Sequence, residues 1–290
     1  MKHLKTYSVF ESQERKELTE EQEKFLNEYT DGTWSYDPAT GLVDIKGNFD
    51  CRNLKLNSLL GIRFGKVTGS FMCSENKLTS LKGAPQEVGG NFSCSYNPID
   101  SLLGAPQKVG GFFRCEANEL TSLEGGPQTV GDSFTCGYNS LTTLHGGPQK
   151  VGNDYNCIKN NLKSLEGAPK KVGGTFYCFR NPLTSLNGAP EEVVGGFVFD
   201  SLNLGRGEWN RNTWLRIFDK GSAKDKQLVL PLLSAEEINR RIPQDPAGMI
   251  MMLKGVWNSE KFKEIRSELV WPEGYEKEMN LAGDLGSIGF

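Results

Sequence analysis

The chain contains 290 residues, of which 37% are hydrophobic, and its formal net charge is −3. This length suits one or two domains, and no apolar run approaches the roughly 18 residues of a membrane-spanning helix. The near-neutral charge gives no general attraction to nucleic acid or to an anionic membrane. The N-terminal sequence lacks the apolar core of a secretory signal, so we expect a cytoplasmic protein with reduced cysteines.

The N-terminal segment, residues 1–46, contains signals for a helix and a hairpin. Thr19 and Gln22 have the spacing of a capping box, which predicts that a helix begins there. Residues 33–36 and 42–45 favour strands, and the Asp-Pro-Ala-Thr-Gly sequence between them favours a turn. Because the end of a repeat array must be shielded from water, we expect this helix and hairpin to cap the repeats that follow.

Residues 47–204 repeat with a period of about 21 residues. The cysteines mark this period, since successive cysteines are separated by 22 residues once and by 21 residues five times. They are Cys51, Cys73, Cys94, Cys115, Cys136, Cys157 and Cys178. A fixed period of this length is typical of a solenoid, in which stacked coils share one core. We therefore predict a mainly β solenoid of eight coils with short, parallel, stacked strands.

Each repeat has the form V-G-G-x-F-x-C-x-x-N-x-L-T-S-L-x-G-A-P-x-x. Phe and Cys alternate with period two, so both point to the interior side of one short strand. The Gly-Ala-Pro segment favours turns and extended backbone, so we expect a non-helical convex side. The asparagine column is expected to form a ladder of hydrogen bonds to the backbone of adjacent coils. Its members are Asn76, Asn97, Asn118, Asn139, Asn160 and Asn181.

The cysteine column has three interpretations. The thiols can pack as small interior hydrophobes, they can form disulfides between neighbouring coils, or they can bind a row of metal ions. Parallel side chains in register point the same way, which disfavours disulfides, and paired C-x-x-C motifs are absent from the column. We expect the cysteines to pack in the interior and to have no chemical role.

The string F-x-C-x-x-N-x-L-x-x-L resembles the L-x-L-x-x-N-x-L signature of leucine-rich-repeat proteins. The short unit and its proline resemble the bacterial effector type of that family. The wording L-T-S-L-x-G-A-P-x-x-V-G-G-x-F-x-C is also similar to repeats in uncharacterised proteins of tailed phages and prophages. The resemblance covers a little over half of the chain and implies binding by the strand face. The chain departs from the family in having Phe and Cys where leucines are usual.

Residues 205–290 lose the period and contain helix signals instead. Ser234 and Glu237 form a second candidate capping box, and Asn258 is a candidate cap for the helix that follows it. A Trp-Pro pair at Trp271 is expected to end that helix. We predict a C-terminal helical cap or small domain.

Signals for catalysis are weak. The chain has two histidines, His3 and His145, far apart in sequence, and its glycine doublets recur too often to form one phosphate loop. Some effector-type leucine-rich-repeat proteins carry a ubiquitin-ligase domain with a catalytic cysteine, but residues 205–290 contain no cysteine. The repeat balances 14 Lys and Arg against 13 Asp and Glu, without the basic stripe of a nucleic-acid-binding surface. We expect no enzyme, no cofactor, no metal site, and no nucleic-acid or membrane partner.

The candidate site is the outer side of the Phe-Cys strands, where the residues vary from coil to coil. Aromatic and arginine side chains, which are enriched at binding hot spots, occur there in several coils. The candidate residues are Tyr96, Phe112, Arg114, Glu116, Tyr138, Ile158, Lys159, Tyr177, Phe179 and Arg180. An alternative interpretation is that these aromatics only stabilise the sheet through cross-strand contacts.

The expected function is therefore non-enzymatic binding of a protein partner by the strand face. The phage similarity implies a host protein as that partner, which the chain would bind or inhibit. Two alternatives stay open. The solenoid can be a structural component of a virion or assembly, or the C-terminal segment can have a separate nucleic-acid-binding or enzymatic role.

Overall fold

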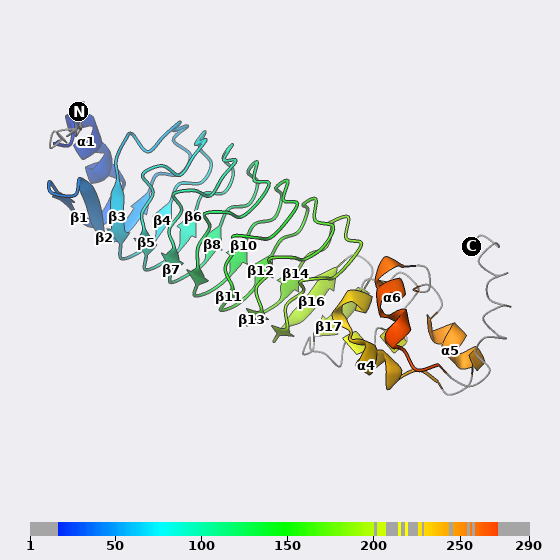
Figure 1. Ribbon diagram of the computed structural model, residues 1–290. Coiled ribbons are helices and arrows are strands. Elements are labelled where there is room, and N and C mark those ends of the chain that lie inside the picture. The colour runs from blue at the N-terminus through cyan, green and yellow to red at the C-terminus, as the bar shows by residue number, and fades with distance from the viewer. Residues whose placement is uncertain are drawn as a thin grey trace, which may run out of the picture.

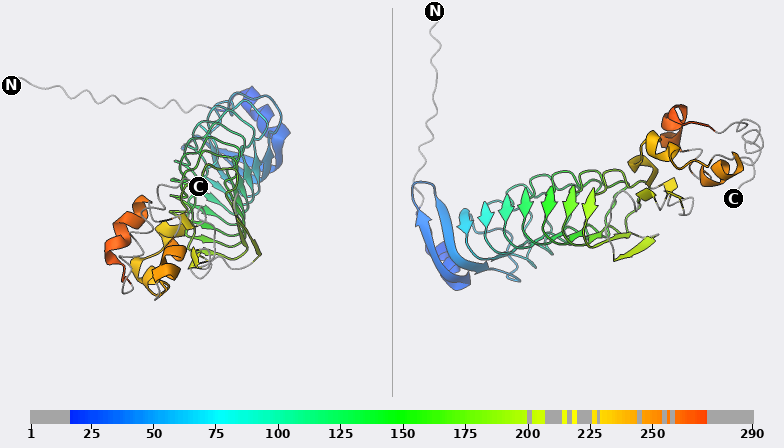
Figure 2. Two further views of the ribbon diagram at one scale, coloured as in Figure 1. Left: turned by 90° about the vertical axis from the view of Figure 1, so that its right-hand side faces the viewer. Right: turned by 90° about the horizontal axis from the view of Figure 1, so that it is seen from below.

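The computed structural model describes residues 17–199, 202–206, 214–215, 218–219, 226–227, 229–243, 246–253, 256 and 259–271. It is a mainly β, parallel solenoid of stacked coils, as the period predicted, with a short helix at the N-terminal end and helices at the C-terminal end (Figure 1). Two sets of very short strands run along the stack (Figure 2).

The N-terminal cap begins with helix α1 (Glu20–Tyr29). The predicted capping box is confirmed, because the Thr19 hydroxyl accepts from the Gln22 backbone N–H and the Gln22 side chain accepts from the Thr19 N–H. The Nε2 of Gln22 also donates to the backbone oxygen of Leu60 at 2.9 Å, which ties the helix to the first coil.

The predicted hairpin is also confirmed. It consists of β1 (Thr30–Asp37) and β2 (Leu42–Asp50), which pair antiparallel. Strand β2 runs past the hairpin and pairs in parallel with the next coil, with Phe49 beside Phe71. The cap and the solenoid therefore share one continuous strand.

The first sheet of the solenoid is formed by the Phe-Cys strands, and its outer side is called the strand face below. After β2 its strands are β4 (Phe71–Met72), β6 (Phe92–Ser93), β8 (Phe113–Arg114), β10 (Phe134–Thr135), β12 (Tyr155–Asn156), β14 (Phe176–Tyr177) and β16 (Gly196–Phe199). They pair in parallel and in register, so that each aromatic residue lies beside the aromatic residue of the next coil. Equivalent residues of successive coils thus form straight columns.

A second row of strands, called the second sheet below, was not predicted from the sequence. Its strands are β3 (Phe64–Val67), β5 (Glu87–Val88), β7 (Lys108–Val109), β9 (Thr129–Val130), β11 (Lys150–Val151), β13 (Lys171–Val172) and β15 (Glu192–Val193). It runs alongside the first and joins it at β2, which pairs in parallel with both β3 and β4. The valines are buried and the residues before them are mostly exposed. In most of these strands the buried valine is followed by glycine, so they lack the second apolar residue that makes Phe-x-Cys recognisable as an alternating pattern.

The interior is built from the repeat columns. Rings of neighbouring coils stack from Phe49 to Phe197, with centroids 5.0–5.9 Å apart. All seven cysteines are buried beside them and none forms a disulfide. Their packing as interior hydrophobes is confirmed, and the burial of Phe, Cys, Leu and Val columns supplies the apolar stabilisation of the stack.

The asparagine ladder is confirmed by hydrogen bonds in every coil that has it. In Asn118 the Nδ2 donates to the backbone oxygens of Cys94 at 3.2 Å and Cys115 at 3.0 Å. Its Oδ1 accepts from the backbone N–H groups of Asn97 and Ile99 in the preceding coil. The side chain therefore satisfies backbone groups at the turn that strand pairing leaves without partners.

The glycine that follows most second-sheet valines lets neighbouring coils approach closely. A Cβ atom on Gly131 would lie 2.0 Å from the backbone oxygen of Gly110 in the preceding coil. A side chain at this position would force neighbouring coils apart, which explains the recurring Val-Gly pair.

The C-terminal part of the chain starts with β17 (Leu202–Arg206), which pairs antiparallel with β16. The described helices after it are 3-10 helix η1 (Leu230–Leu232), α4 (Ala235–Asn239), α5 (Pro246–Leu253), α6 (Glu260–Ile265) and 3-10 helix η2 (Arg266–Glu268). The capping box at Ser234 and Glu237 is confirmed. The prediction of Asn258 as a cap is wrong, because the hydroxyl of Ser259 accepts from the backbone N–H of Phe262 and caps α6.

The last described helix stops before Trp271, in accord with the stop signal there. No helix in the described part of the chain is long and apolar enough to cross a membrane.

Candidate functional site

The strand face is a continuous surface because the backbone ladder runs on beyond the short strands. The N–H of Tyr96 donates to the oxygen of Glu116, and the N–H of Tyr138 donates to the oxygen of Ile158. The N–H of Lys159 likewise donates to the oxygen of Phe179. Side chains on both sides of each buried cysteine are therefore held in register from coil to coil.

None of the ten predicted site residues is buried. Among the aromatic members, Tyr96 and Tyr138 are the most exposed, at 58% and 47%. Arg114, Lys159 and Arg180 are exposed as well. The half-buried members are Phe112, Glu116, Ile158, Tyr177 and Phe179.

The residue before each ladder asparagine has a left-handed backbone. In the six coils with a ladder asparagine, φ at this position lies between 53° and 59°. The residues are Glu75, Tyr96, Ala117, Tyr138, Lys159 and Arg180. This conformation costs a residue with a Cβ about 1–2 kcal/mol, and glycine or asparagine would reduce that cost. These positions nevertheless have residues other than glycine, and their side chains project outward from a rigid backbone.

Cations on the strand face lie over aromatic rings. The guanidinium carbon of Arg114 is 4.2 Å from the centroid of Phe112, and the Nζ of Lys159 is 4.6 Å from that of Tyr138. Arg180 is 5.9 Å from Phe179. Such contacts hold flexible cationic side chains in defined positions at an exposed surface.

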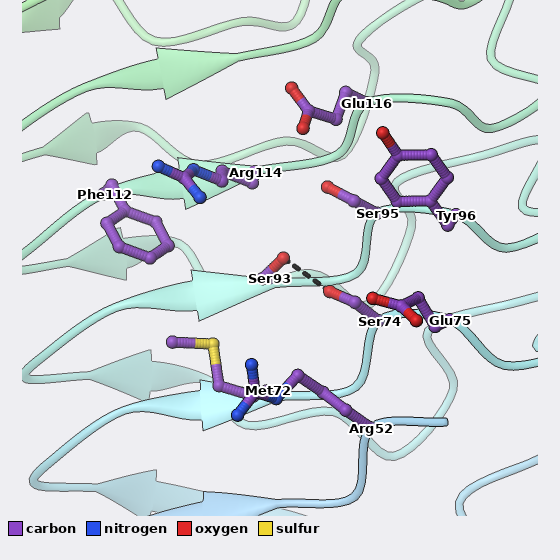
Figure 3. A pocket seen from close by; sticks show the side chains of 10 residues that line it. All are labelled: Arg52, Met72, Ser74, Glu75, Ser93, Ser95, Tyr96, Phe112, Arg114 and Glu116. Carbon is purple, nitrogen blue, oxygen red and sulfur yellow. Dashed lines mark hydrogen bonds between the residues drawn. The ribbon is translucent and has the colours of Figure 1, made fainter. Parts of the chain in front are cut away.

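The strand face has two parts that differ in charge. The C-terminal part, called the aromatic–cationic patch, consists of Tyr138, Ile158, Lys159, Tyr177, Phe179 and Arg180. The N-terminal part contains a hollow of about 180 Å³. The hollow is lined by Arg52, Met72, Ser74, Glu75, Ser93, Ser95, Tyr96, Phe112, Arg114 and Glu116 (Figure 3).

Four of the residues around the hollow were predicted from the sequence, namely Tyr96, Phe112, Arg114 and Glu116. The serines that create the hollow were not predicted, because only large and charged side chains stand out in the outer columns. A serine in a column whose neighbours are large is the signal that could have revealed it.

The cysteines do not belong to the site. They lie on the interior side of the strands, and desolvation by burial raises the pKa of Cys51 and of Cys94 to about 12. A thiol is nucleophilic or metal-binding as the thiolate, so this environment suppresses both activities.

The described residues contain no group of His, Cys, Asp and Glu side chains that could hold a metal ion. His145 is exposed, and His3 lies outside the described residues. The arrangement on the strand face offers contact area, charge and hydrogen-bonding groups, which are the requirements of binding.

The chain matches no family model, no curated protein and no solved structure.

Proposed function

We propose that this chain is a non-enzymatic protein-binding module that uses the strand face of its solenoid. The observation that carries the proposal is the row of exposed aromatic and cationic side chains on left-handed turns, from Tyr96 to Arg180. Aromatic residues and arginine dominate binding energy at protein interfaces. Their fixed backbone lowers the entropy lost when a partner binds.

The caps of the solenoid favour a binding module over an assembly component. At the N-terminal end β1 covers β2, and at the C-terminal end β17 covers β16, both by antiparallel pairing. These caps interrupt the parallel register at both ends, which disfavours end-to-end growth of the sheet.

The proposal also includes a leucine-rich-repeat origin for the solenoid and a host protein as its partner. The F-x-C-x-x-N-x-L string, the parallel stacked strands and the asparagine ladder support a leucine-rich-repeat origin. The similarity to phage repeats supports a host protein as partner and a place in the host cytoplasm, where seven buried thiols would stay reduced.

The test is affinity capture with three forms of the full chain: wild type, the double variant Tyr138→Ala/Phe179→Ala, and the control Leu103→Ala. Leu103 is 69% exposed but lies outside the strand face, so its variant controls for loss of an exposed apolar side chain. We expect wild type and control to retain the same protein and the double variant to lose it. Retention by all three forms would contradict binding by the strand face.

A further inference from the structure

The hollow on the strand face exists because serines replace large side chains in two columns. Ser93 lies between Met72 and Arg114 in the paired strands. Ser95 occupies the position that Glu116 and Ile158 take in later coils. The coils themselves are unchanged there, so the missing side-chain volume is left as a recess in the surface.

The floor of the hollow is polar and has an unused hydrogen-bonding group. The hydroxyls of Ser74 and Ser93 are 2.6 Å apart and bond to each other. Ser95 is only 4% exposed, and its hydroxyl has no hydrogen-bond partner among the described residues. This hydroxyl points away from Tyr96, toward the side of the hollow on which Arg114 lies (Figure 3). Buried polar groups in proteins are nearly always bonded, so a group that enters the hollow and reaches this covered oxygen would gain a hydrogen bond.

The charges around the hollow leave a negative excess. Arg52 is already occupied by Asp50, with Nε–Oδ1 and Nη2–Oδ2 distances of 2.9 and 2.6 Å. The hydrogen bonds and charge of Asp50, and to a smaller extent the charge of Glu75, raise the pKa of Arg52. Neither Glu75 nor Glu116 forms a salt bridge with a described residue. They outnumber Arg114, the one cation of the lining without a carboxylate partner.

Apolar and acidic groups lie on different sides of the hollow. Met72 and Phe112 are on one side, together with Arg114, whereas Glu75, Tyr96 and Glu116 are on the other (Figure 3). A side chain with an apolar stem and a planar cationic head matches this division. The stem would contact Met72 and Phe112, and the head would reach the carboxylates and the ring of Tyr96.

We propose that the hollow is a specificity pocket for an arginine side chain of the protein partner. The guanidinium is bound by Glu75 and Glu116, stacks on Tyr96 and donates to the Ser95 hydroxyl. This inference rests on the proposed function and adds the chemistry of the partner. The partner presents an arginine to the hollow and an acidic, apolar segment to the aromatic–cationic patch, so the strand face also fixes its orientation.

The probe for this proposal is N-acetyl-arginine N-methylamide, titrated into the ¹⁵N-labelled full chain. We expect saturable shifts of the backbone amides of Ser74, Ser93, Ser95 and Glu116, with a dissociation constant of about 1 mM, as befits a ligand this small. The corresponding aspartate derivative is expected to give no saturable shifts. Tighter binding of the aspartate derivative would overturn the proposal by assigning an anion site to Arg114.

Two variants connect the shifts to the hollow. Glu75→Gln/Glu116→Gln is expected to weaken binding of the arginine probe at least fivefold, whereas the exposed control Glu124→Gln is expected to leave it unchanged. Ser95→Ile, which introduces the residue found in the same column at Ile158, is expected to fill the hollow and abolish the shifts. Unchanged affinity in the double carboxamide variant, or no saturable shifts in wild type, would overturn the proposal.

The result of the arginine titration can be distinguished from the result of the affinity capture described above. If the patch variant loses the partner but the arginine probe does not bind, the strand face binds its partner without an arginine pocket. If the probe binds and the patch variant still retains the partner, the hollow is a binding pocket but the patch is not part of the interface.

Discussion

The two sheets of the solenoid consist mostly of two-residue strands and have the same parallel stacking, yet their outer faces differ. The second sheet presents a row of mainly charged residues, with Glu87 between Lys66 and Lys108 at 3.5 and 3.4 Å, and Lys171 paired with Glu192 at 2.7 Å. The strand face presents exposed aromatic residues, Tyr96 and Tyr138, among its charged ones. A stacked sheet in this protein therefore does not need aromatic residues on its outer side, which argues against a purely stabilising role for those of the strand face.

The two sheets enclose the same interior, which contains the buried cysteines. The largest expected effect is a loss of free energy of unfolding at alkaline pH. Burial raises the pKa of six thiols: Cys51, Cys73, Cys94, Cys115, Cys136 and Cys157. In the unfolded chain these thiols lose their protons near pH 8.5, whereas the folded chain keeps them. The unfolded state thus binds fewer protons above pH 8.5, so stability is complete below that pH and falls above it.

Between pH 7.5 and pH 9 the expected loss is about 5 kcal/mol in the free energy of unfolding. Urea titrations in the presence of a phosphine reductant would measure it. The variant Cys94→Ala/Cys115→Ala should lose less over the same range, by about 1.5 kcal/mol. A denaturation midpoint that stays constant from pH 7.5 to pH 9 would show that the thiols ionise in the folded protein.

The next largest expected effect on the free energy of unfolding comes from removing one asparagine of the ladder. Asn118→Ala leaves buried backbone groups of two coils without partners, and we expect it to lower the free energy of unfolding by about 1–3 kcal/mol. The outward substitution Thr135→Ala is the matched control and should change it by less than about 0.5 kcal/mol. Equal denaturation midpoints for Asn118→Ala and wild type would remove the ladder assignment.

Tyr155 is the exception in the stacked aromatic column. Its hydroxyl is buried and finds no oxygen or nitrogen partner among the described residues, although it interacts with the Cys136 thiol, a weak partner. We expect Tyr155→Phe to raise the free energy of unfolding by about 1 kcal/mol. The reverse change in the neighbouring coil, Phe134→Tyr, should lower it. A destabilised Tyr155→Phe variant would show that the thiol contact is worth more than the desolvation of the hydroxyl.

The smallest expected effect decides between the two interpretations of the strand face. Tyr138→Ser and, on the second sheet, Lys108→Ser should each change the free energy of unfolding by less than about 0.5 kcal/mol. A loss above about 1 kcal/mol for Tyr138→Ser alone would support cross-strand stabilisation as the role of this residue. Thermal and urea denaturation of the two variants measure the difference.

The period of the cysteines was sufficient to predict the solenoid, its buried columns and the asparagine ladder, since a repeated pattern averages out local ambiguity. The second sheet was missed, because Val88 is followed by glycines and has no second apolar residue two positions on, unlike Phe92, which is followed by Cys94. The cap of α6 was placed one residue early, because Asn258 and Ser259 are both good N-caps and only the backbone conformation distinguishes them.

For the candidate site, the outward-facing columns were predicted from the sequence but the hollow was not. The columns after the cysteines were predicted to face outward, and none of Tyr96, Tyr138 and Phe179 is buried. The hollow depends on the three-dimensional juxtaposition of serines from different coils with Arg52 and Glu75, and no short motif in the sequence marks it.

The most direct test of the central claim compares the two faces in one binding measurement. The partner identified by affinity capture is titrated calorimetrically with the full chain carrying Tyr138→Ser/Phe179→Ser or Lys108→Ser/Lys150→Ser. Binding by the strand face predicts at least a roughly 100-fold loss of affinity for the first variant and less than about a twofold change for the second. Equal affinities of the two variants, or a larger loss in the second, would contradict it.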